Sequence, residues 1–455
     1  MLEPRPAEIQ PPKAQEPKLK IGIVLEEDRK SHLTVRVSRS SFELQGQGVK
    51  VPLEGARNYL LRNIDGALAL EFKGGQLALS RQPLSICDPA PQALEAKAGI
   101  ILHPMVVGRS FHWRKELELS FAGAVHFYAA GKYLVAVNEI NLEQYLACVL
   151  SSEMGTACPA EFMKAQAIAA RSWVVVFLHN KHTGTPYTIC NDDDCQRYQG
   201  TTYLSQSVLK AVGDCRGEFL ITADNLVCAA YYSKSCGGHS EEPENVLGFK
   251  VRGLKPAWDA FPKRPAKLDL REEEQFLQWL SGRHHKQLEV FCSPATVPEA
   301  KLSSYLGAVD EKGAYYRWEH SITEAELIQN LKDRFKVGDI AEILDLAPTR
   351  RGYSGRILGL EVKYKDTEGA VKSFNLSDQY DIRRALHRSF LLSSAITYCW
   401  ERNQDGQRTL AIKGCGWGHG LGLCQIGAVG MALKGFNCQD ILRHYYPDCR
   451  VVKAY

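Results

Sequence analysis

The most constraining feature of the chain is a stretch near its C-terminus in which every second residue from 414 to 422 is glycine. It reads GCGWGHGLGLCQIGAVG over residues 414–430. Glycine accepts positive φ angles and lets another backbone or a ligand approach closely. The pattern predicts a bare loop that carries His419 and leads into a helix, an arrangement suited to a polar polymer or an anion. A tight turn with a structural histidine is the alternative.

Composition restricts the classes of partner. The chain has 455 residues, 45% of them hydrophobic and 24% charged, which is typical of a globular protein with two to three domains. A formal charge of +4 is too small to indicate nucleic acid. The glycine-rich stretch lacks the Lys-Ser/Thr pair of a phosphate-binding loop, so we expect no nucleotide either.

Hydrophobic periodicity predicts an α+β fold of mixed helices and antiparallel strands. Segments such as HLTVRVS and ALALEFKG alternate apolar and polar residues as strands do, whereas NLEQYLACVLSSE and the run after Pro159 have helical spacing. The predicted parts are a flexible Pro-rich linker (1–17), a strand-rich N-terminal region (18–135), the first part of a core (136–260), an inserted α+β subdomain (261–395), and the second part of the core with the glycine-rich loop (396–455).

Several motifs in a fixed order resemble one family. They are LEQYLACVLSSEM, PAEFMKAQAIAARSW, CQRYQG, YYSKSCGGHSEE, SGRILGLEV, CGWGHGLGLCQIGAVGMALKG and ILRHYYPDC. Together they resemble the SpoIID/LytB family of bacterial cell-wall proteins over roughly residues 115–455. The resemblance implies a lytic transglycosylase that cleaves peptidoglycan glycan strands, already stripped of peptides, between N-acetylmuramic acid and N-acetylglucosamine and leaves 1,6-anhydro ends. A non-catalytic glycan-binding enhancer of a cell-wall amidase is the alternative.

Glu153 occupies the family's SEM glutamate position and is the predicted catalytic residue. A helix C-terminus and partial burial both disfavour a carboxylate, so both favour the acid that protonates a leaving glycosidic oxygen. The C6 hydroxyl of muramic acid then attacks, and no second carboxylate is required. A hydrolase would need one; the candidates are Glu161, Asp192, Asp193, Asp194, Glu241 and Glu242. A solvated surface glutamate is the alternative interpretation of Glu153.

The predicted substrate contacts surround this acid. His419 and Gln425 are expected to bind sugar, and Trp417 to stack on a sugar face, with a core tryptophan as the open alternative. Tyr198 is expected to line the cleft. Arg171 is a further candidate, although a buried pairing with a carboxylate is favoured for it. A cysteine hydrolase built on Cys158 or Cys415 with His419 lacks an oxyanion-hole signature.

The resemblance also implies a structural zinc site. Cys190 and Cys195 can reach one ion if the intervening residues form a turn, and Cys236 and His182 are expected to complete the site, with His239 as another possibility. Asp194 stands where the family often has histidine, and a disulfide or free thiols are the alternative to zinc. Most of the 14 cysteines are expected to be small buried hydrophobic residues. The implied location is exported, periplasmic or cell-envelope, with a signal peptide already removed.

Overall fold

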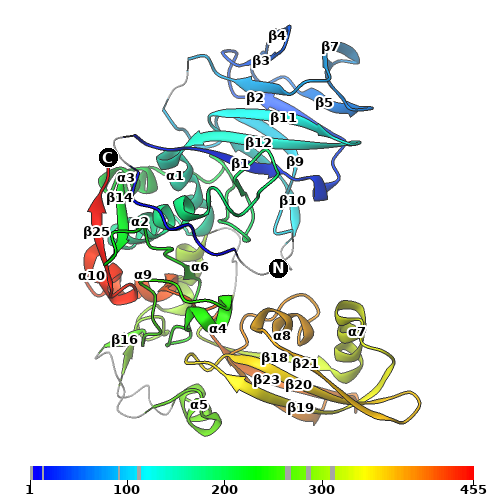
Figure 1. The fold of residues 1–455 in the computed structure, drawn as a ribbon, viewed down its shortest axis with the longest axis vertical. Coiled ribbons are helices and arrows are strands. Elements are labelled where there is room, and N and C mark those ends of the chain that lie inside the picture. Colours follow the sequence, from blue (N-terminus) through cyan, green and yellow to red (C-terminus); the bar gives the residue numbers. More distant parts are fainter. Residues whose placement is uncertain are drawn as a thin grey trace.

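The computed structural model describes residues 4–12, 15–90, 93–109, 114–261, 268–282, 288–307 and 313–455. Helices and mainly antiparallel sheets confirm the predicted α+β class. Figure 1 shows two sheets at one end, a helical layer in the middle and a separate α+β unit at the other end. Among the described residues, no helix has the length and apolar character that crossing a bilayer would require.

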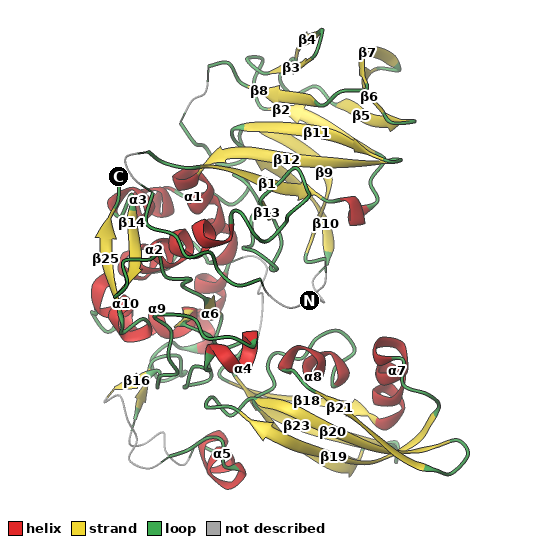
Figure 2. Cartoon of the chain, viewed as in Figure 1, coloured by secondary structure: helices red, strands yellow, loops and turns green. Residues whose placement is uncertain are grey.

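Two sheets form the N-terminal region (Figure 2). Alternation sets their inner faces, as in HLTVRV, where Leu33, Val35 and Val37 are buried. One sheet has the order β13 (Ile189–Cys190), β1 (Lys18–Val24), β12 (Tyr133–Asn141), β11 (Ala124–Ala130), β8 (Leu84–Cys87), β3 (Glu43–Gly46), β4 (Val49–Pro52). The other has the order β10 (Lys115–Phe121), β9 (Ile100–Val107), β2 (His32–Val37), β5 (Tyr59–Ile64), β6 (Ala67–Phe72), β7 (Gly75–Ser80). The region ends at Asn141, beyond the predicted limit of 135.

The predicted flexible linker is wrong for the described part of residues 1–17. The N–H of Ala7 donates to the carbonyl of Val176 at 2.9 Å, and the carbonyl of Ile9 accepts from Val227 at 2.8 Å. The carbonyl of Pro17 accepts from Leu142 at 2.9 Å. The segment therefore lies along the helical layer, because backbone hydrogen bonds to distant residues outweigh its Pro-rich composition.

A helical layer positions the candidate site. The first two of its helices, α1 (Leu142–Glu153) and α2 (Ala160–Phe177), are almost wholly buried. The helix α2 packs against its neighbours in this layer, which are α1, α3 (Gln206–Asp214), α9 (Gln425–Leu433), α10 (Cys438–Tyr445) and the strand β14 (Glu218–Thr222). The strand β14 pairs with β25 (Cys449–Lys453), so the C-terminal end of the chain closes the layer.

A second hydrophobic core runs from Trp318 to Ile412. Its elements are β18 (Arg317–Thr323), α7 (Glu324–Phe335), β19 (Ile340–Arg351), β20 (Ile357–Asp366), β21 (Val371–Leu376), α8 (Gln379–Ala385), β22 (Ile396–Arg402) and β23 (Arg408–Cys415). The strand β23 lies between β18 and β22 in one sheet. The subdomain therefore includes strands that were assigned to residues 396–455.

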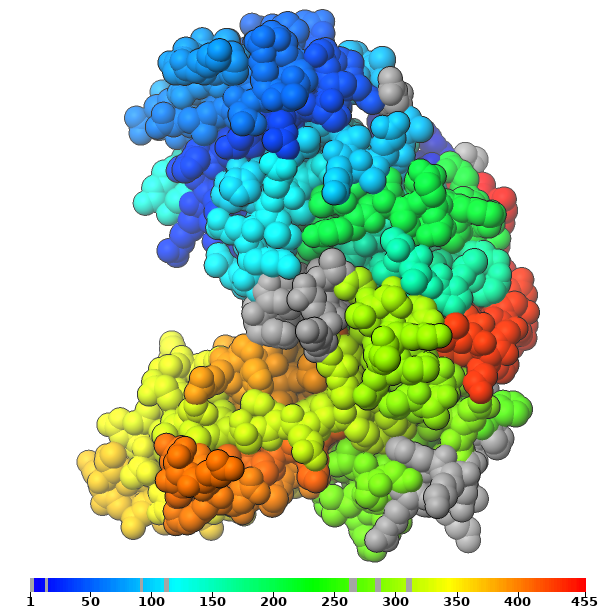
Figure 3. Space-filling model, turned by 180° about the vertical axis from the view of Figure 1, so that it is seen from behind, coloured from blue at the N-terminus to red at the C-terminus, as the bar shows by residue number. Residues whose placement is uncertain are grey.

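The described parts of residues 261–316, predicted to belong to that subdomain, contribute instead to the main core. Phe276, Trp279 and Val290 are buried there. The short elements involved are β16 (Ala260–Phe261), α5 (Glu273–Leu280), β17 (Glu289–Val290) and α6 (Glu299–Leu306). Seen from behind, the surface is hollowed between the N-terminal sheets and the α+β subdomain (Figure 3).

Candidate active site

Glu153 is the last residue of α1 and is half-buried. Its Oε1 accepts hydrogen bonds from the hydroxyl of Tyr232 at 3.1 Å and from the backbone N–H of Arg197 at 3.3 Å. Its Oε2 accepts from Nε2 of Gln425 at 3.1 Å. Lys234 donates to the backbone carbonyl of Glu153 at 3.0 Å and so caps the helix end. Both carboxyl oxygens are thus oriented by groups from three other segments.

Tyr232 belongs to β15 (Tyr232–Ser233), which pairs in parallel with β24 (Leu423–Cys424). Burial, followed by the charge of Glu153, raises the pKa of Tyr232 well above its usual value. The phenol therefore stays protonated at ordinary pH. A hydroxyl can donate to a carboxylate or accept from a carboxylic acid, so this contact suits both states that an acid/base residue must pass through.

A second acidic group, Asp193, lies in the same environment. Burial raises the pKa of Asp193 to about 6, and the charges of Asp192 and Glu153 add to the rise against the opposing charge of Arg197. Arg197 pairs with Asp193 at 3.2 Å. Four of the five other sequence candidates for a second carboxylate engage different partners: Asp192 pairs with Arg109, Asp194 with Lys181, Glu161 with Lys164, and Glu241 accepts from Tyr353 and Ser354.

The glycine-rich loop needs its glycines for contacts within the protein. Gly416, Gly418, Gly420 and Gly422 have φ angles of 75°, 99°, 78° and 61°. A Cβ at Gly422 would lie 2.0 Å from the Tyr231 carbonyl oxygen. One at Gly420 would lie 2.6 Å from the guanidinium of Arg356, which is buried and donates to the carbonyl of Gly418 at 3.1 Å. The close approach made possible by glycine is thus to the protein's own groups.

His419 holds this loop together. Its Nδ1 accepts from the N–H of Leu421 at 3.0 Å, and the ring also hydrogen-bonds to the backbone of Tyr232. Burial, followed by the charges of Arg356 and Arg383, lowers the pKa of His419 to about 3. The ring is neutral and engaged with backbone on both sides. These contacts give the half-buried ring a structural role, which links the loop to the strand that carries Tyr232, and the sugar contact of His419 stays a prediction.

Because His419 is neutral when folded, we expect acid to destabilise the protein. The unfolded chain binds a proton on this histidine below about pH 6.5, whereas the folded chain does not until about pH 3. The free energy of unfolding should fall as the pH drops below about 6.5, and less so in His419→Gln. Nuclear magnetic resonance of the ring should show no titration between pH 5 and 8. A titration midpoint of His419 near 6.5 would contradict this description.

Gln425 and Trp417 have different surroundings. Gln425 begins α9, is buried, and donates to Glu153, so its amide supports the acid instead of reaching outward. Trp417 is half-buried and stacks on Tyr315, with ring centroids 4.6 Å apart. It keeps an exposed part, so it remains a candidate surface for a sugar.

Tyr198, predicted to line the cleft, lies in the core, and Arg171 forms the buried carboxylate pair that the sequence favoured over a substrate contact. Tyr198 is fully buried, stacks on Tyr145 and hydrogen-bonds to Asn138. Arg171 is fully buried and forms a bidentate pair with Glu143 at 3.0 and 2.6 Å. Neither side chain is available to a glycan, because the aromatic ring and the guanidinium both complete contacts between elements of the helical layer.

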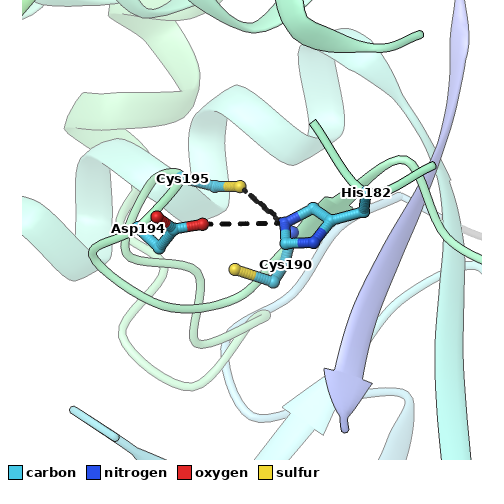
Figure 4. A group of neighbouring side chains, drawn as sticks. All are labelled: His182, Cys190, Asp194 and Cys195. Carbon is cyan, nitrogen blue, oxygen red and sulfur yellow. Dashed lines mark hydrogen bonds and ion pairs between the residues drawn. The ribbon is translucent and has the colours of Figure 1, made fainter. Parts of the chain in front are cut away.

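The loop that precedes Arg197 holds a group of potential metal ligands (Figure 4). His182, Cys190, Asp194 and Cys195 have ligand atoms within 4.8 Å of one another. The His182 Nε2 lies 3.3 Å from Cys195 Sγ and 3.8 Å from Asp194 Oδ2. One nitrogen, two sulfurs and one oxygen fit the ligand set and number that zinc takes in structural sites.

Cys236, predicted as the fourth ligand of this group, lies in a different cluster with Cys292 and Cys424. His239 is also elsewhere, in an edge-to-face contact with the ring of Trp258. Asp194, expected from the sequence to be a weaker ligand, is the fourth member of the group with His182, Cys190 and Cys195. The cysteines of the hydrolase alternative are likewise engaged elsewhere: Cys415 is buried, and Cys158 donates to the carbonyl of Tyr305 at 3.2 Å.

Sequence reasoning missed the groups that contact Glu153 from β15 and from the loop. Tyr232 and Lys234 lie in YYSKSCGG, a motif that carried the family resemblance without any role assigned to these two residues. Arg356 was also missed, because the segment SGRILGLEV reads as an ordinary strand start. The polar residues within YYSKS were the sequence feature that could have indicated these contacts with Glu153.

Two family models and several curated proteins match the chain. A family model described as Stage II sporulation protein, SpoIID, matches residues 130–221, and a model described as a domain of unknown function matches residues 254–422. An uncharacterised protein of Brachyspira hyodysenteriae is 25% identical over 334 residues, 73% of each chain. The amidase enhancer of Bacillus subtilis is 28% identical over 303 residues, 66% of this chain and 39% of the enhancer. Stage II sporulation protein D of the same organism is 24% identical over 70% of this chain and 76% of that protein.

Proposed function

The chain belongs to the SpoIID/LytB family, and from this premise we propose that it is a peptidoglycan lytic transglycosylase with Glu153 as its general acid/base. One observation carries the proposal: donors from three separate segments orient both oxygens of this carboxyl group. A carboxyl that merely solvated a helix end would need no such arrangement. The amidase enhancer is similar over only 39% of its own length, so an activity taken from it is the weaker alternative.

The chemistry needs a single proton carrier. Glu153 as the acid gives its proton to the glycosidic oxygen while the bond from that oxygen to muramic acid C1 breaks. The C6 hydroxyl of the same sugar then forms a bond to C1, and the Glu153 carboxylate takes its proton. Tyr232 and Gln425 keep the carboxyl group in one orientation through both transfers.

A glycan strand needs an open surface beside the acid. The hollow between the N-terminal sheets and the α+β subdomain (Figure 3) is our proposed path for it. Trp417, stacked on Tyr315, is the proposed sugar platform. We further propose that the protein acts in the cell envelope after export, where this polymer is found.

A structural zinc ion on His182, Cys190, Asp194 and Cys195 forms part of the proposal. Such an ion would fix the turn between the two cysteines and Arg197, whose N–H contacts Glu153. The pKa of the Cys190 thiol is lowered by a hydrogen bond from Cys195, with further help from His182, which favours the thiolate form that binds metal. The role is to position the loop, since no substrate atom needs the ion in the steps above.

Asp193 gives the activity a predicted pH signature. Its carboxyl group changes charge near pH 6 beside the acid/base residue, so kcat/KM of the wild type should show an inflection near that pH. Asp193→Asn should lose the inflection. Identical pH profiles of kcat/KM for the two proteins would show that Asp193 does not affect the reaction.

Two parallel incubations distinguish a transglycosylase from an amidase enhancer. Peptide-free glycan is incubated with the protein alone, and intact cell walls are incubated with a cell-wall amidase with and without the protein. A transglycosylase releases glycan fragments with no amidase present. A protein that only accelerates the amidase, and leaves bare glycan intact, would overturn the proposal in favour of the enhancer.

A further inference from the structure

A second group of potential metal ligands lies within the main core, apart from His182 and its neighbours. It consists of Cys236, Asp259, Cys292 and Cys424, whose ligand atoms all lie within 4.8 Å of one another. None of these residues is more than 2% exposed. No step proposed for Glu153 uses any of them.

Paired short segments bring these four residues together. Cys424 is in β24, directly opposite Ser233 of β15, and Cys236 follows β15. Asp259 precedes β16 and Cys292 follows β17, and the two strands pair with each other. The N–H of Phe291 donates to the carbonyl of Asp259 at 2.8 Å, which fixes the second pair of ligands side by side.

Their spacing is that of ligands around one ion. Sγ of Cys236 and Sγ of Cys292 are 3.9 Å apart. Zinc–sulfur bonds of about 2.3 Å in a tetrahedron place two sulfurs about 3.8 Å apart, whereas a disulfide requires about 2.05 Å. Thiolate-rich tetrahedral sets suit zinc or iron–sulfur centres, and a carboxylate is a ligand that zinc also takes. We propose that Cys236, Cys292, Cys424 and Asp259 bind a structural zinc ion.

The surroundings supply the contacts that metal-bound thiolates and carboxylates receive. The N–H groups of Cys236 and Gly427 donate to Sγ of Cys424, at 3.2 and 3.3 Å, and the N–H of Gly238 donates to Sγ of Cys236 at 3.3 Å. Hydrogen bonds of this kind orient ligands in metal sites.

Asp259 is also held by polar groups, and none of the described cationic residues pairs with it. Tyr445 donates its hydroxyl to Oδ1 at 2.6 Å, and the N–H of Cys292 donates to Oδ2 at 3.0 Å. Within the described ranges, no lysine, arginine or histidine forms an ion pair with Asp259. Buried charged groups are paired or coordinate metals, so a zinc ion in this group would give the Asp259 carboxylate a coordination partner.

The ion would stabilise two segments whose residues contact Glu153. Cys424 caps α9 and directly precedes Gln425, which donates to Glu153. Cys236 lies two residues after Lys234, which caps the end of α1. This consequence rests on the proposed function, whereas the zinc site itself does not.

Metal content tests the site independently of activity. Cys190→Ala with Cys195→Ala disables the other group, and elemental analysis of that purified variant should still find one zinc per chain. Adding Cys292→Ala should remove that zinc, whereas adding Cys148→Ala, at another fully buried cysteine, should retain it. Absence of zinc before Cys292 is changed, iron in its place, or a mass lower by two hydrogens from a disulfide would overturn the proposal.

The wild-type protein gives a second readout should the double variant fail to fold. Cobalt exchanged for zinc absorbs through thiolate-to-metal charge transfer, with an intensity that grows with the number of bound thiolates. Two filled groups contain five cysteine ligands, and the His182 group alone contains two. An intensity that matches only two thiolates would overturn the site, even if glycan cleavage is normal. Failure of the proposed function would leave this spectrum unchanged.

Discussion

Glu153→Gln should lower the rate of glycan cleavage by about 10²–10⁴-fold, the range typical of losing general acid–base catalysis. Glutamine keeps the length and shape of the side chain but can neither give nor take the proton. Its amide can still accept from Tyr232, so the fold around α1 should be preserved. The measurement is the initial rate of fragment release from peptide-free glycan, with the unfolding midpoint recorded for both proteins.

Glu161→Gln is the matched control. Glu161 also lies near a helix end, pairs with Lys164 and accepts from the N–H of Cys438, and its hydrogen bonds and ion pairs within the described ranges do not involve Glu153. Its variant should cleave glycan at close to the wild-type rate. Equal rates for wild type and Glu153→Gln would refute the assignment of the acid.

The largest expected effect on stability is that of Arg171→Ala. The substitution leaves the buried carboxylate of Glu143 without its cation, which typically costs about 3–5 kcal/mol in free energy of unfolding. The guanidinium also donates to the carbonyl of Glu218 at 2.9 Å, so β14 loses a contact to α2 as well. Denaturant unfolding of the variant measures the loss.

Arg216→Ala provides the comparison for a similar pair at the surface. Arg216 pairs with Glu16 at 2.5 Å, but its side chain is 49% exposed. Exposed pairs contribute about 0–1 kcal/mol, so this variant should remain near the wild type. A loss below about 1 kcal/mol for Arg171→Ala would show that the buried pair is not needed for the helical layer.

The parts of the fold that follow from local periodicity could be predicted from the sequence. Residues 142–153 have helical spacing, and the strands before them alternate, so both were predicted near their observed limits. The limits of the α+β subdomain could not be predicted, because β23 pairs with β18 after about ninety residues of intervening chain. The packing of residues 4–12 also depends on distant hydrogen bonds, for which their Pro-rich composition gives no sign.

The candidate site could be predicted only where a residue lies within a recognisable local motif. Glu153 stands at a helix end within a recognisable motif, whereas Tyr232 and Gln425 lie 79 and 272 residues away along the chain. Cysteine spacing predicted that Cys190 and Cys195 lie close together, as they do, because a short turn joins them. It assigned Cys236 to the wrong group, since nothing in the sequence shows which distant cysteines converge in the fold.

The most direct test of the central claim is the mass of the sugar ends released from peptide-free glycan by the wild-type protein. Attack by the C6 hydroxyl incorporates no water, so each new muramic acid end should carry the 1,6-anhydro form, lighter by one water than a hydrolysed end. Anhydro ends that disappear in Glu153→Gln are the predicted result. Reducing ends, or no cleavage by a folded wild-type protein, would contradict it.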